Sequence, residues 1–405
     1  MNDKETVRPR IVILGGGYGG VSAAREMIRR GVHKQARITL VNDSNFHYLT
    51  TLMHYAILKP IDDEKVSIFL PEFLGSSIDF IRATVVRIDA PGNRVVIKIR
   101  ENEGELEYDY LIVALGWEPD YYNIPGLKEH AFVLHDIQNA HEIHDHIEKA
   151  FASYDKDPSQ TWIMHILIGG ASYTGIEIAA EVADLVPVLA RKYSIDPAAV
   201  KISMVGIFLP EFDNVLANHA MNYLRQRGID VRAGTMIERV EAQEVKFQAD
   251  DAMRPGLVIW AGGIRANDVA GRSGLECDKK GRVVVDELLR CTSHKNIFVI
   301  GDCARAVDNS GRPLAQTAQF AAGQGEWLAR SMGKILSGQT PKAYAGRNLG
   351  MFLSVGRKAG LGVLYVGKHK FRFTGYIARL LKKGAGYRYL WSIGGVRLVV
   401  KKLLA

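Results

Sequence analysis

The chain has 405 residues, of which 47% are apolar and 24% are charged, and this composition excludes a disordered, collagenous or coiled-coil protein. A single hydrophobic core rarely exceeds about 300 residues, so two or three domains are expected. Three cysteines without a Cys-x-x-Cys pair exclude a disulfide framework and predict a reduced, intracellular protein. The N-terminus is polar, so no signal peptide is expected. No apolar run is long enough to predict a membrane span.

The charge is distributed unevenly along the chain. The net charge is +8, but the sequence after Glu326 contains sixteen Lys and Arg residues and no Asp or Glu. The rest of the chain is therefore mildly acidic, and the basic tail predicts an anionic partner for the C-terminal region alone. Nucleic acid and an anionic membrane surface are the two candidates.

The first predicted element is a buried strand over residues 11–14, which leads into a glycine turn, a helix from residue 21 and a second strand over 37–41. Gly15, Gly17 and Gly20 have the spacing Gly-x-Gly-x-x-Gly. Such glycines allow a sharp turn, close approach of a pyrophosphate and tight packing of the helix on the strand. The N-terminal unit is therefore predicted to bind a dinucleotide.

The polar residues after the second strand are candidates for the adenosine ribose. A carboxylate is usual near residue 42, where this chain has Asn42 followed by Asp43, so the ribose contact is not assigned to one of the two. Val85 and Gly116 complete the candidate contacts of this first nucleotide.

A second unit of the same kind follows about 155 residues later. It consists of a strand over residues 162–168, a turn with Gly170, Ser172 and Gly175, a helix over 176–185 and a strand over 200–205. Serine replaces the glycine that lets a pyrophosphate approach, and the strand ends at Gly206, without a carboxylate for NADH or an arginine for NADPH. A working nicotinamide-nucleotide site, to which Gly262 would belong, and a retained fold with an altered site both remain open.

A third buried strand ends in Gly301 and Asp302. With two nucleotide-binding units present, this Gly-Asp pair is predicted to reach the ribityl hydroxyls of FAD, although a structural turn is the alternative. Glu177 lies in the first turn of the helix that follows the second glycine turn. It either points into the cleft where the nucleotide meets the flavin or only interacts favourably with the helix dipole. The cysteines and the histidines at 141, 144 and 146 form no metal pattern, and these histidines are expected on a solvated helix face.

The basic tail contains a predicted amphipathic helix. Tyr376, Ile377, Leu380 and Leu381 share one side of it, and Lys and Arg residues fill the opposite side. A basic amphipathic helix with aromatic margins favours a position in a membrane interface over binding of nucleic acid. A surface for another protein or for a second copy of the chain is the remaining alternative.

Taken together, these features resemble the type II NADH:quinone oxidoreductases, a family of single-chain FAD enzymes at the inner face of bacterial membranes. The resemblance covers nearly the whole chain. It rests on residues 13–20, 108–116, 168–177, 260–265, 298–304, 317–321 and 393–402.

The resemblance implies that NADH reduces FAD and that the reduced FAD then passes two electrons to a membrane quinone, here a menaquinone-like one. It implies that Glu177 and Gln319 are the catalytic residues and that Ala318 contacts FAD. The family has an Ala-Gln-x-Ala-x-Gln segment between flavin and quinone. In this chain the second Gln position is Gly323, and Gln324 follows one residue later, so Gln319 and Gln324 are the candidate quinone contacts.

The expected α/β architecture has two Rossmann-like dinucleotide-binding domains, the second inserted in the first, and a C-terminal amphipathic membrane-anchoring segment. Residues 1–122 and 275–345 are assigned to the FAD-binding domain, 123–274 to the NADH-binding-like domain and 346–405 to membrane association. The expected location is peripheral, at the cytoplasmic face of the cell membrane, with a homodimer as a further option. The alternatives are a quinone reductase with another electron donor and a non-catalytic flavoprotein scaffold.

Overall fold

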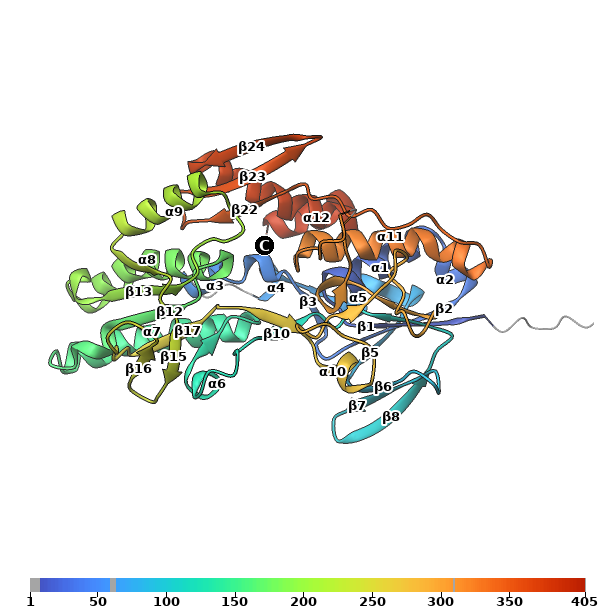
Figure 1. Cartoon of the computed structure of the whole chain (residues 1–405), viewed down its shortest axis with the longest axis horizontal. Helices are drawn as coiled ribbons and strands as arrows, with labels where there is room; N and C mark the ends of the chain where they lie inside the picture. The colour runs from blue at the N-terminus through green and yellow to red at the C-terminus, as the bar shows by residue number, and fades with distance from the viewer. Residues whose placement is uncertain (1–7, 59–62, 309, 405) are drawn as a thin grey trace, which may run out of the picture.

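A computed structural model describes residues 8–58, 63–308 and 310–404. Figure 1 shows two α/β halves side by side, with the C-terminal strands and helix lying over both. None of the helices described is long and apolar enough to cross a membrane.

The first half is built on a five-stranded parallel sheet around the N-terminal strand. The strand order is β20 (Ile297–Val299), β9 (Tyr110–Val113), β1 (Arg10–Leu14), β2 (Arg37–Asn42) and β5 (Asp79–Arg82). Helices α1 (Tyr18–Arg29) and α11 (Ala318–Leu336) pack together on one face, next to the short α2 (Val32–Gln35). The central strand β1 is apolar because helices and a second sheet bury both of its faces.

The opposite face carries an antiparallel sheet of β6 (Thr84–Asp89), β7 (Arg94–Ile99) and β8 (Asn102–Glu107). Nearby are α10 (Val269–Arg272) and the parallel pair β19 (Val283–Val284) and β21 (Ala304–Arg305). The segment between β2 and β5 forms β3 (Phe46–Tyr48), α3 (Tyr55–Leu58), α4 (Asp63–Val66), β4 (Ser67–Phe69) and α5 (Leu70–Leu74).

The second half repeats the arrangement within the interval between β9 and β20, as expected for an inserted domain. Its parallel sheet has the order β11 (Phe132–Val133), β17 (Leu257–Trp260), β12 (His165–Gly169), β13 (Lys201–Gly206) and β14 (Ile229–Ala233). Its helices are α6 (Leu127–His130), α7 (Ile137–Lys156), α8 (Tyr173–Tyr193) and α9 (Asn214–Gln226), and β15 (Ile237–Val240) pairs with β16 (Val245–Phe247). The antiparallel strands β10 (Trp117–Pro119) and β18 (Ile264–Ala266) connect the two halves.

Two details differ from the sequence-based expectation. The strand predicted from residue 162 begins at His165, because Thr161–Met164 forms a 3₁₀ turn. The histidines of α7 do not form a solvated face: His144 is buried and its Nδ1 lies 2.8 Å from the Ile57 carbonyl, while His146 Nε2 lies 3.1 Å from the Gly256 carbonyl. Both rings pack against neighbouring elements, a long-range contact that helical spacing does not reveal.

The C-terminal region is a folded layer. The antiparallel strands β22 (Gly350–Ser354), β23 (Gly360–Val366) and β24 (His369–Thr374) lead into α12 (Gly375–Leu404), which breaks at Gly395, where φ is +66°. Leu353 and Leu361 join the core of the second half, whereas Leu390 and Ile393 join the core of the first. The C-terminal region therefore packs on both halves of the molecule.

Candidate functional site

The turn between β1 and α1 has the shape of a pyrophosphate cradle. Gly15 has a φ of +105°, and a Cβ built there would lie 2.2 Å from the Ala114 carbonyl oxygen. A Cβ on Gly20 would lie 1.9 Å from the Gly15 oxygen, so both positions require glycine. A Cβ on Gly17 would meet nothing within 4 Å, which leaves open space over the N-terminus of α1 for an anionic group.

The polar residues after β2 brace this turn. The Asn42 Oδ1 accepts a hydrogen bond of 2.8 Å from the Gly16 N–H, and its Nδ2 donates to the Ser44 carbonyl at 2.8 Å. Asp43 is exposed to solvent, and Val85, a residue of β6, is buried in the hydrophobic core. Asn42 thus sets the shape of the turn, and Asp43 is the more accessible of the two.

Asp302 lies in the 3₁₀ turn Gly301–Cys303, at the carboxyl end of β20. Its Oδ1 is buried and has no hydrogen-bond partner among the described residues, and burial raises the pKa of the carboxyl group to about 6. A buried polar atom without a hydrogen-bond partner destabilises the folded protein, so this oxygen is suited to accept a hydrogen bond from a hydroxyl group of a bound cofactor. The ribityl chain of FAD supplies such hydroxyls, and the cradle and Asp302 together fit FAD.

Two neighbours hold the Asp302 turn in place. The Gly301 N–H donates to Gln324 Oε1 at 2.6 Å, and Gln316 Nε2 donates to the Asp302 carbonyl at 2.9 Å. Gly116, which has a φ of +73°, donates its N–H to Cys303 Sγ at 3.1 Å. Gln324 is buried behind the turn in this arrangement.

The second glycine turn, between β12 and α8, has nearly the same backbone as the first. Ser172 has φ −89° and ψ −163°, against −79° and −168° for Gly17, so serine adopts this conformation without strain. Gly170 and Gly175 require glycine: a Cβ would lie 2.3 Å from the Ala261 carbonyl carbon and 1.9 Å from the Gly170 oxygen, respectively. At Gly262, a Cβ would lie 2.1 Å from the Trp260 ring. The turn keeps the geometry of a pyrophosphate site despite the serine.

Glu177 belongs to a buried polar cluster that joins α8 to the turn before α3, to β22 and to α12. Its Oε1 accepts from the Lys382 ammonium group and from the Ser354 N–H at 2.9 Å. Its Oε2 lies 3.3 Å from His54 Nδ1, and Lys382 Nζ lies 3.2 Å from His54 Nε2. Because an ammonium group can only donate, Lys382 donates to Nε2 and the His54 proton is on Nδ1, directed at Glu177.

The charges in this cluster follow from burial. Burial lowers the pKa of His54 to about 3, so the imidazole is neutral at pH 7. Burial raises the pKa of Glu177, but His54, Lys382 and the Ser354 N–H more than offset this effect, and the pKa is below its ordinary value. Since His54 is neutral, Lys382 supplies the compensating positive charge. Burial lowers the pKa of Lys382 itself.

A second polar chain links α12 to the first glycine turn. His47 Nδ1 lies 3.0 Å from the Gly16 carbonyl oxygen, and His47 Nε2 lies 2.9 Å from the Tyr389 hydroxyl. Burial lowers the pKa of His47 to about 4, so the ring is neutral, donates to Gly16 and accepts from Tyr389. The Tyr389 ring packs on Tyr18 with centroids 4.6 Å apart.

The predicted quinone contacts lie on α11. Gln319 is half-buried in its first turn, beside Ala318, and its Nε2 donates to the Arg347 carbonyl at 3.2 Å. A Cβ built on Gly323 would lie 3.7 Å from the Tyr344 hydroxyl oxygen, its nearest neighbour, so this position has room for a side chain. Gln324 is buried, so Gln319 is the more accessible of the two predicted quinone contacts.

Several of the contacts described above were not singled out from the sequence. The sequence does not distinguish His47 and His54 from other histidines, and it indicates only that Lys382 is on the basic side of the tail helix and that Tyr389 is one of the aromatic residues of the tail. Lys382 and Glu177 are 205 residues apart, and no local pattern connects them. The sequence interval between Tyr389 and His47 is 342 residues.

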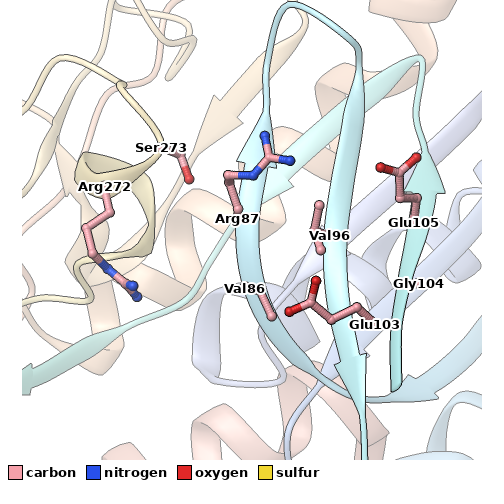
Figure 2. A pocket seen from close by; sticks show the side chains of 8 residues that line it. All are labelled: Val86, Arg87, Val96, Glu103, Gly104, Glu105, Arg272 and Ser273. Atoms are coloured by element: carbon pink, nitrogen blue, oxygen red, sulfur yellow. The ribbon is translucent and has the colours of Figure 1, made fainter. Parts of the chain in front are cut away.

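A surface pocket of about 440 Å³ lies elsewhere, between the β6–β8 sheet and α10, where Figure 2 shows Arg87, Arg272 and Glu103 around it. Its lining residues belong to neither glycine turn. No group of three or more His, Cys, Asp or Glu residues among those the structure describes could hold a metal ion.

Comparisons with known proteins agree with this geometry. Residues 9–325 match the family model of pyridine nucleotide-disulphide oxidoreductases. The type II NADH:quinone oxidoreductase of Staphylococcus aureus strain NCTC 8325 is 33% identical over 407 residues, which cover 98% of each chain. The chain belongs to the type II NADH:quinone oxidoreductase family.

Solved structures of related enzymes share the fold. The NDH2 structure of Plasmodium falciparum in complex with NADH superposes with a TM-score of 0.85 at 17% identity, covering 98% of each chain. The sulfide:quinone oxidoreductase of Aquifex aeolicus gives a TM-score of 0.76 at 18% identity, over 95% of this chain and 91% of that one.

Proposed function

We propose that this chain is an FAD-dependent oxidoreductase that transfers electrons from NADH to a quinone. The observation that carries the proposal is the pair of matching glycine turns, together with the unpartnered buried oxygen of Asp302, in a member of the type II NADH:quinone oxidoreductase family. Bound FAD supplies the hydride acceptor for NADH and the electron donor for the quinone.

The residues have separate tasks in this proposal. The turn with Gly15, Gly17 and Gly20 holds the FAD pyrophosphate, Asp302 accepts hydrogen bonds from the ribityl chain, and Asp43 or Asn42 contacts the ribose. The turn with Gly170, Ser172 and Gly175 holds the NADH pyrophosphate, where the Ser172 hydroxyl adds a hydrogen-bond donor.

The quinone side of the site uses α11 and α12. Gln319 donates to a quinone carbonyl oxygen, because it is the accessible glutamine at the start of α11. Glu177 and Lys382 form a buried charged pair, in which the Lys382 ammonium group holds the proton.

The exposed side of α12 supports a proposal for the location in the cell. Tyr376, Ile377, Leu380 and Trp391 are between 48% and 61% exposed, and basic residues flank them. We assign this face to the cytoplasmic surface of the cell membrane, where a menaquinone-like acceptor is dissolved. A second copy of the chain is the competing partner for the same face, and a mass measurement in detergent distinguishes the two.

The three cysteines argue against a sulfide donor. All are free thiols, and burial raises the pKa of Cys303 to about 12, which makes it unreactive. Cys277 is half-buried, and its Sγ lies 3.3 Å from the Leu275 carbonyl oxygen.

The test separates the two half-reactions under anaerobic conditions. Mixing the purified holoenzyme with NADH bleaches the flavin absorption within seconds, and adding a soluble quinone restores it. Gln319→Ala is expected to slow the second step at least tenfold more than the first, as expected when one hydrogen bond to the substrate is lost. A flavin that stays oxidised at millimolar NADH contradicts the proposal and supports another donor or a scaffold.

A further inference from the structure

The carboxyl end of β13 differs from the usual nicotinamide-nucleotide site. Its last residue, Gly206, has a φ of +127°, and a Cβ built there would lie 3.3 Å from Gly170 Cα and from the Ala171 nitrogen. In Rossmann-type units, an acidic side chain near this point bonds the ribose hydroxyls of NAD and repels the 2′-phosphate of NADP. The backbone of this chain strains any L side chain at position 206.

The loop over residues 207–213 lies against the second glycine turn. The Leu209 N–H donates to the Ala171 carbonyl at 3.0 Å, and the Phe212 ring stacks on Tyr173 with centroids 5.4 Å apart. The loop has two acids. The Glu211 carboxylate bonds its own backbone N–H, and burial raises its pKa.

The second acid, Asp213, is also engaged. It caps α9 by accepting from the Leu216 N–H at 3.2 Å, and it pairs with Lys370 Nζ at 2.6 Å and Arg372 Nε at 2.8 Å, both from β24. Two cations on one carboxylate leave a surplus positive charge beside the start of α9.

Glu211 is exposed, but its carboxylate bonds its own backbone N–H, and other accessible side chains at this strand end are neutral. Ile207 is 63% exposed, Met236 is 41% exposed, and the Gly234 N–H donates to the Gly206 carbonyl at 2.9 Å, which ties the end of β14 to the end of β13. Arg232, opposite Val205, is paired with Asp230 at 2.8 Å. An adenosine placed here meets the apolar side chains of Ile207 and Met236, beside a Glu211 carboxylate that bonds its own backbone N–H.

We propose that the second nucleotide site accepts NADPH as well as NADH, with little discrimination at the 2′ position. The inference rests on the proposed function, in which a reduced nicotinamide nucleotide donates hydride to the bound flavin. NADPH gives up the same hydride and leaves as NADP⁺, so the 2′-phosphate takes no part in the bond changes. Discrimination needs an attractive contact to one ribose and a repulsive one to the other, and the glycine at position 206 supplies neither.

The primary test measures binding without turnover. Calorimetric titration of the oxidised holoenzyme with NAD⁺ and with NADP⁺, at low ionic strength, is expected to give dissociation constants within about tenfold of each other. A preference for NAD⁺ of more than about 100-fold overturns the proposal. If Glu211→Gln then removes that preference, Glu211 holds the ribose in place of a residue at position 206.

A charge introduced at the neighbouring position provides the matched variant. Ile207→Glu places a carboxylate at the strand end, and Ile207→Gln is the uncharged control of the same shape. The ratio of NADP⁺ to NAD⁺ affinity is expected to fall at least tenfold in the Glu variant relative to the Gln variant. An equal ratio in the two variants shows that the ribose lies elsewhere and overturns the proposal.

Measuring flavin bleaching by NADPH and by NADH in the same preparations distinguishes the inference about the nucleotide site from the proposed function. Comparable binding of both nucleotides without bleaching by either supports the inference about the site and contradicts the proposed donor. Bleaching by NADH alone, with weak binding of NADP⁺, supports the proposed function and contradicts the inference.

Discussion

Glu181 lies one helical turn after Glu177 on α8 and is completely buried. Neither carboxylate oxygen has a hydrogen-bond partner among the residues that the structure describes. Burial, together with the nearby Asp184 and Glu177, raises its pKa from 4.5 to about 8. Glu181 is therefore protonated at pH 7 and stores a proton next to the Glu177 cluster.

This raised pKa predicts a pH-dependent stability. The folded protein keeps the Glu181 proton up to about pH 8, whereas the unfolded chain releases it near its ordinary pKa, so stability falls as the pH rises between these values. The limiting slope is about 1.4 kcal/mol per pH unit. We expect Glu181→Gln to flatten the decrease of Tm between pH 5.5 and 8.

The control for this measurement is Glu238→Gln, which changes an exposed acid on β15 and is expected to keep the wild-type slope. Equal slopes for Glu181→Gln and the wild type would show that Glu181 is ionised in the folded protein.

The glycine turns and Asp302 could be predicted from the sequence because each depends on a few adjacent residues. Gly15 and Gly20, for example, contact each other directly, and this contact is encoded in their spacing. The partners of Glu177 could not be predicted, because Lys382 and Ser354 reach it through the packing of α12 and β22 on α8. The serine at position 172 left open whether the second turn is altered, and the match between its backbone angles and those of Gly17 becomes visible only in three dimensions.

At the scale of elements, α12 has two different sides. Ala378, Leu390 and Ile393 are buried against the body of the protein, while Ile377 and Trp391 are 61% and 60% exposed. The sequence predicted the amphipathic helix but not its length or its break at Gly395, since the apolar run after that glycine had no clear period.

The exposed side of α12 predicts the strength of membrane attachment. Ile377→Ser with Trp391→Ser is expected to weaken sedimentation with vesicles that contain anionic lipid at least tenfold, because burial of such a side chain contributes about 1.5–3 kcal/mol. Electron transfer to a soluble quinone analogue should persist.

Val188→Ser is the matched control for this test, since Val188 is 52% exposed on α8 and lies outside α12. Unchanged sedimentation of the α12 variant would assign its apolar face to contact with a second copy of the chain.

At the scale of the whole molecule, the C-terminal layer ties the two halves together. Asp184 of α8 accepts from the Arg357 N–H at 2.8 Å and pairs with Arg227 of α9, while Arg25 of α1 donates to the Ile393 carbonyl at 3.0 Å. Through Tyr389 and His47, α12 also contacts the Gly16 carbonyl of the first glycine turn. Occupancy of that turn and docking of α12 are therefore expected to be coupled.

Removal of FAD tests this coupling. The apoprotein is expected to melt at a lower temperature and to be cleaved faster by trypsin at the basic residues of α12. Adding FAD at about 100 times its dissociation constant should restore about 2.7 kcal/mol of stability. In Tyr389→Phe, which lacks the hydroxyl group that meets His47, trypsin sensitivity should depend less on FAD. An FAD-independent cleavage rate in the wild type would show that the two regions are uncoupled.

The two-sided α12 has a practical consequence for work with the purified protein. A helix with its side chains is only about 10–12 Å across, so a detergent molecule adsorbed on the outer side of α12 lies one helix diameter from Lys382 and Tyr389 on the inner side. Kinetic constants measured in different detergents are thus expected to differ even when the substrate is water-soluble. Kinetic constants measured in nanodiscs of a defined lipid provide the reference with which constants measured in detergent should be compared.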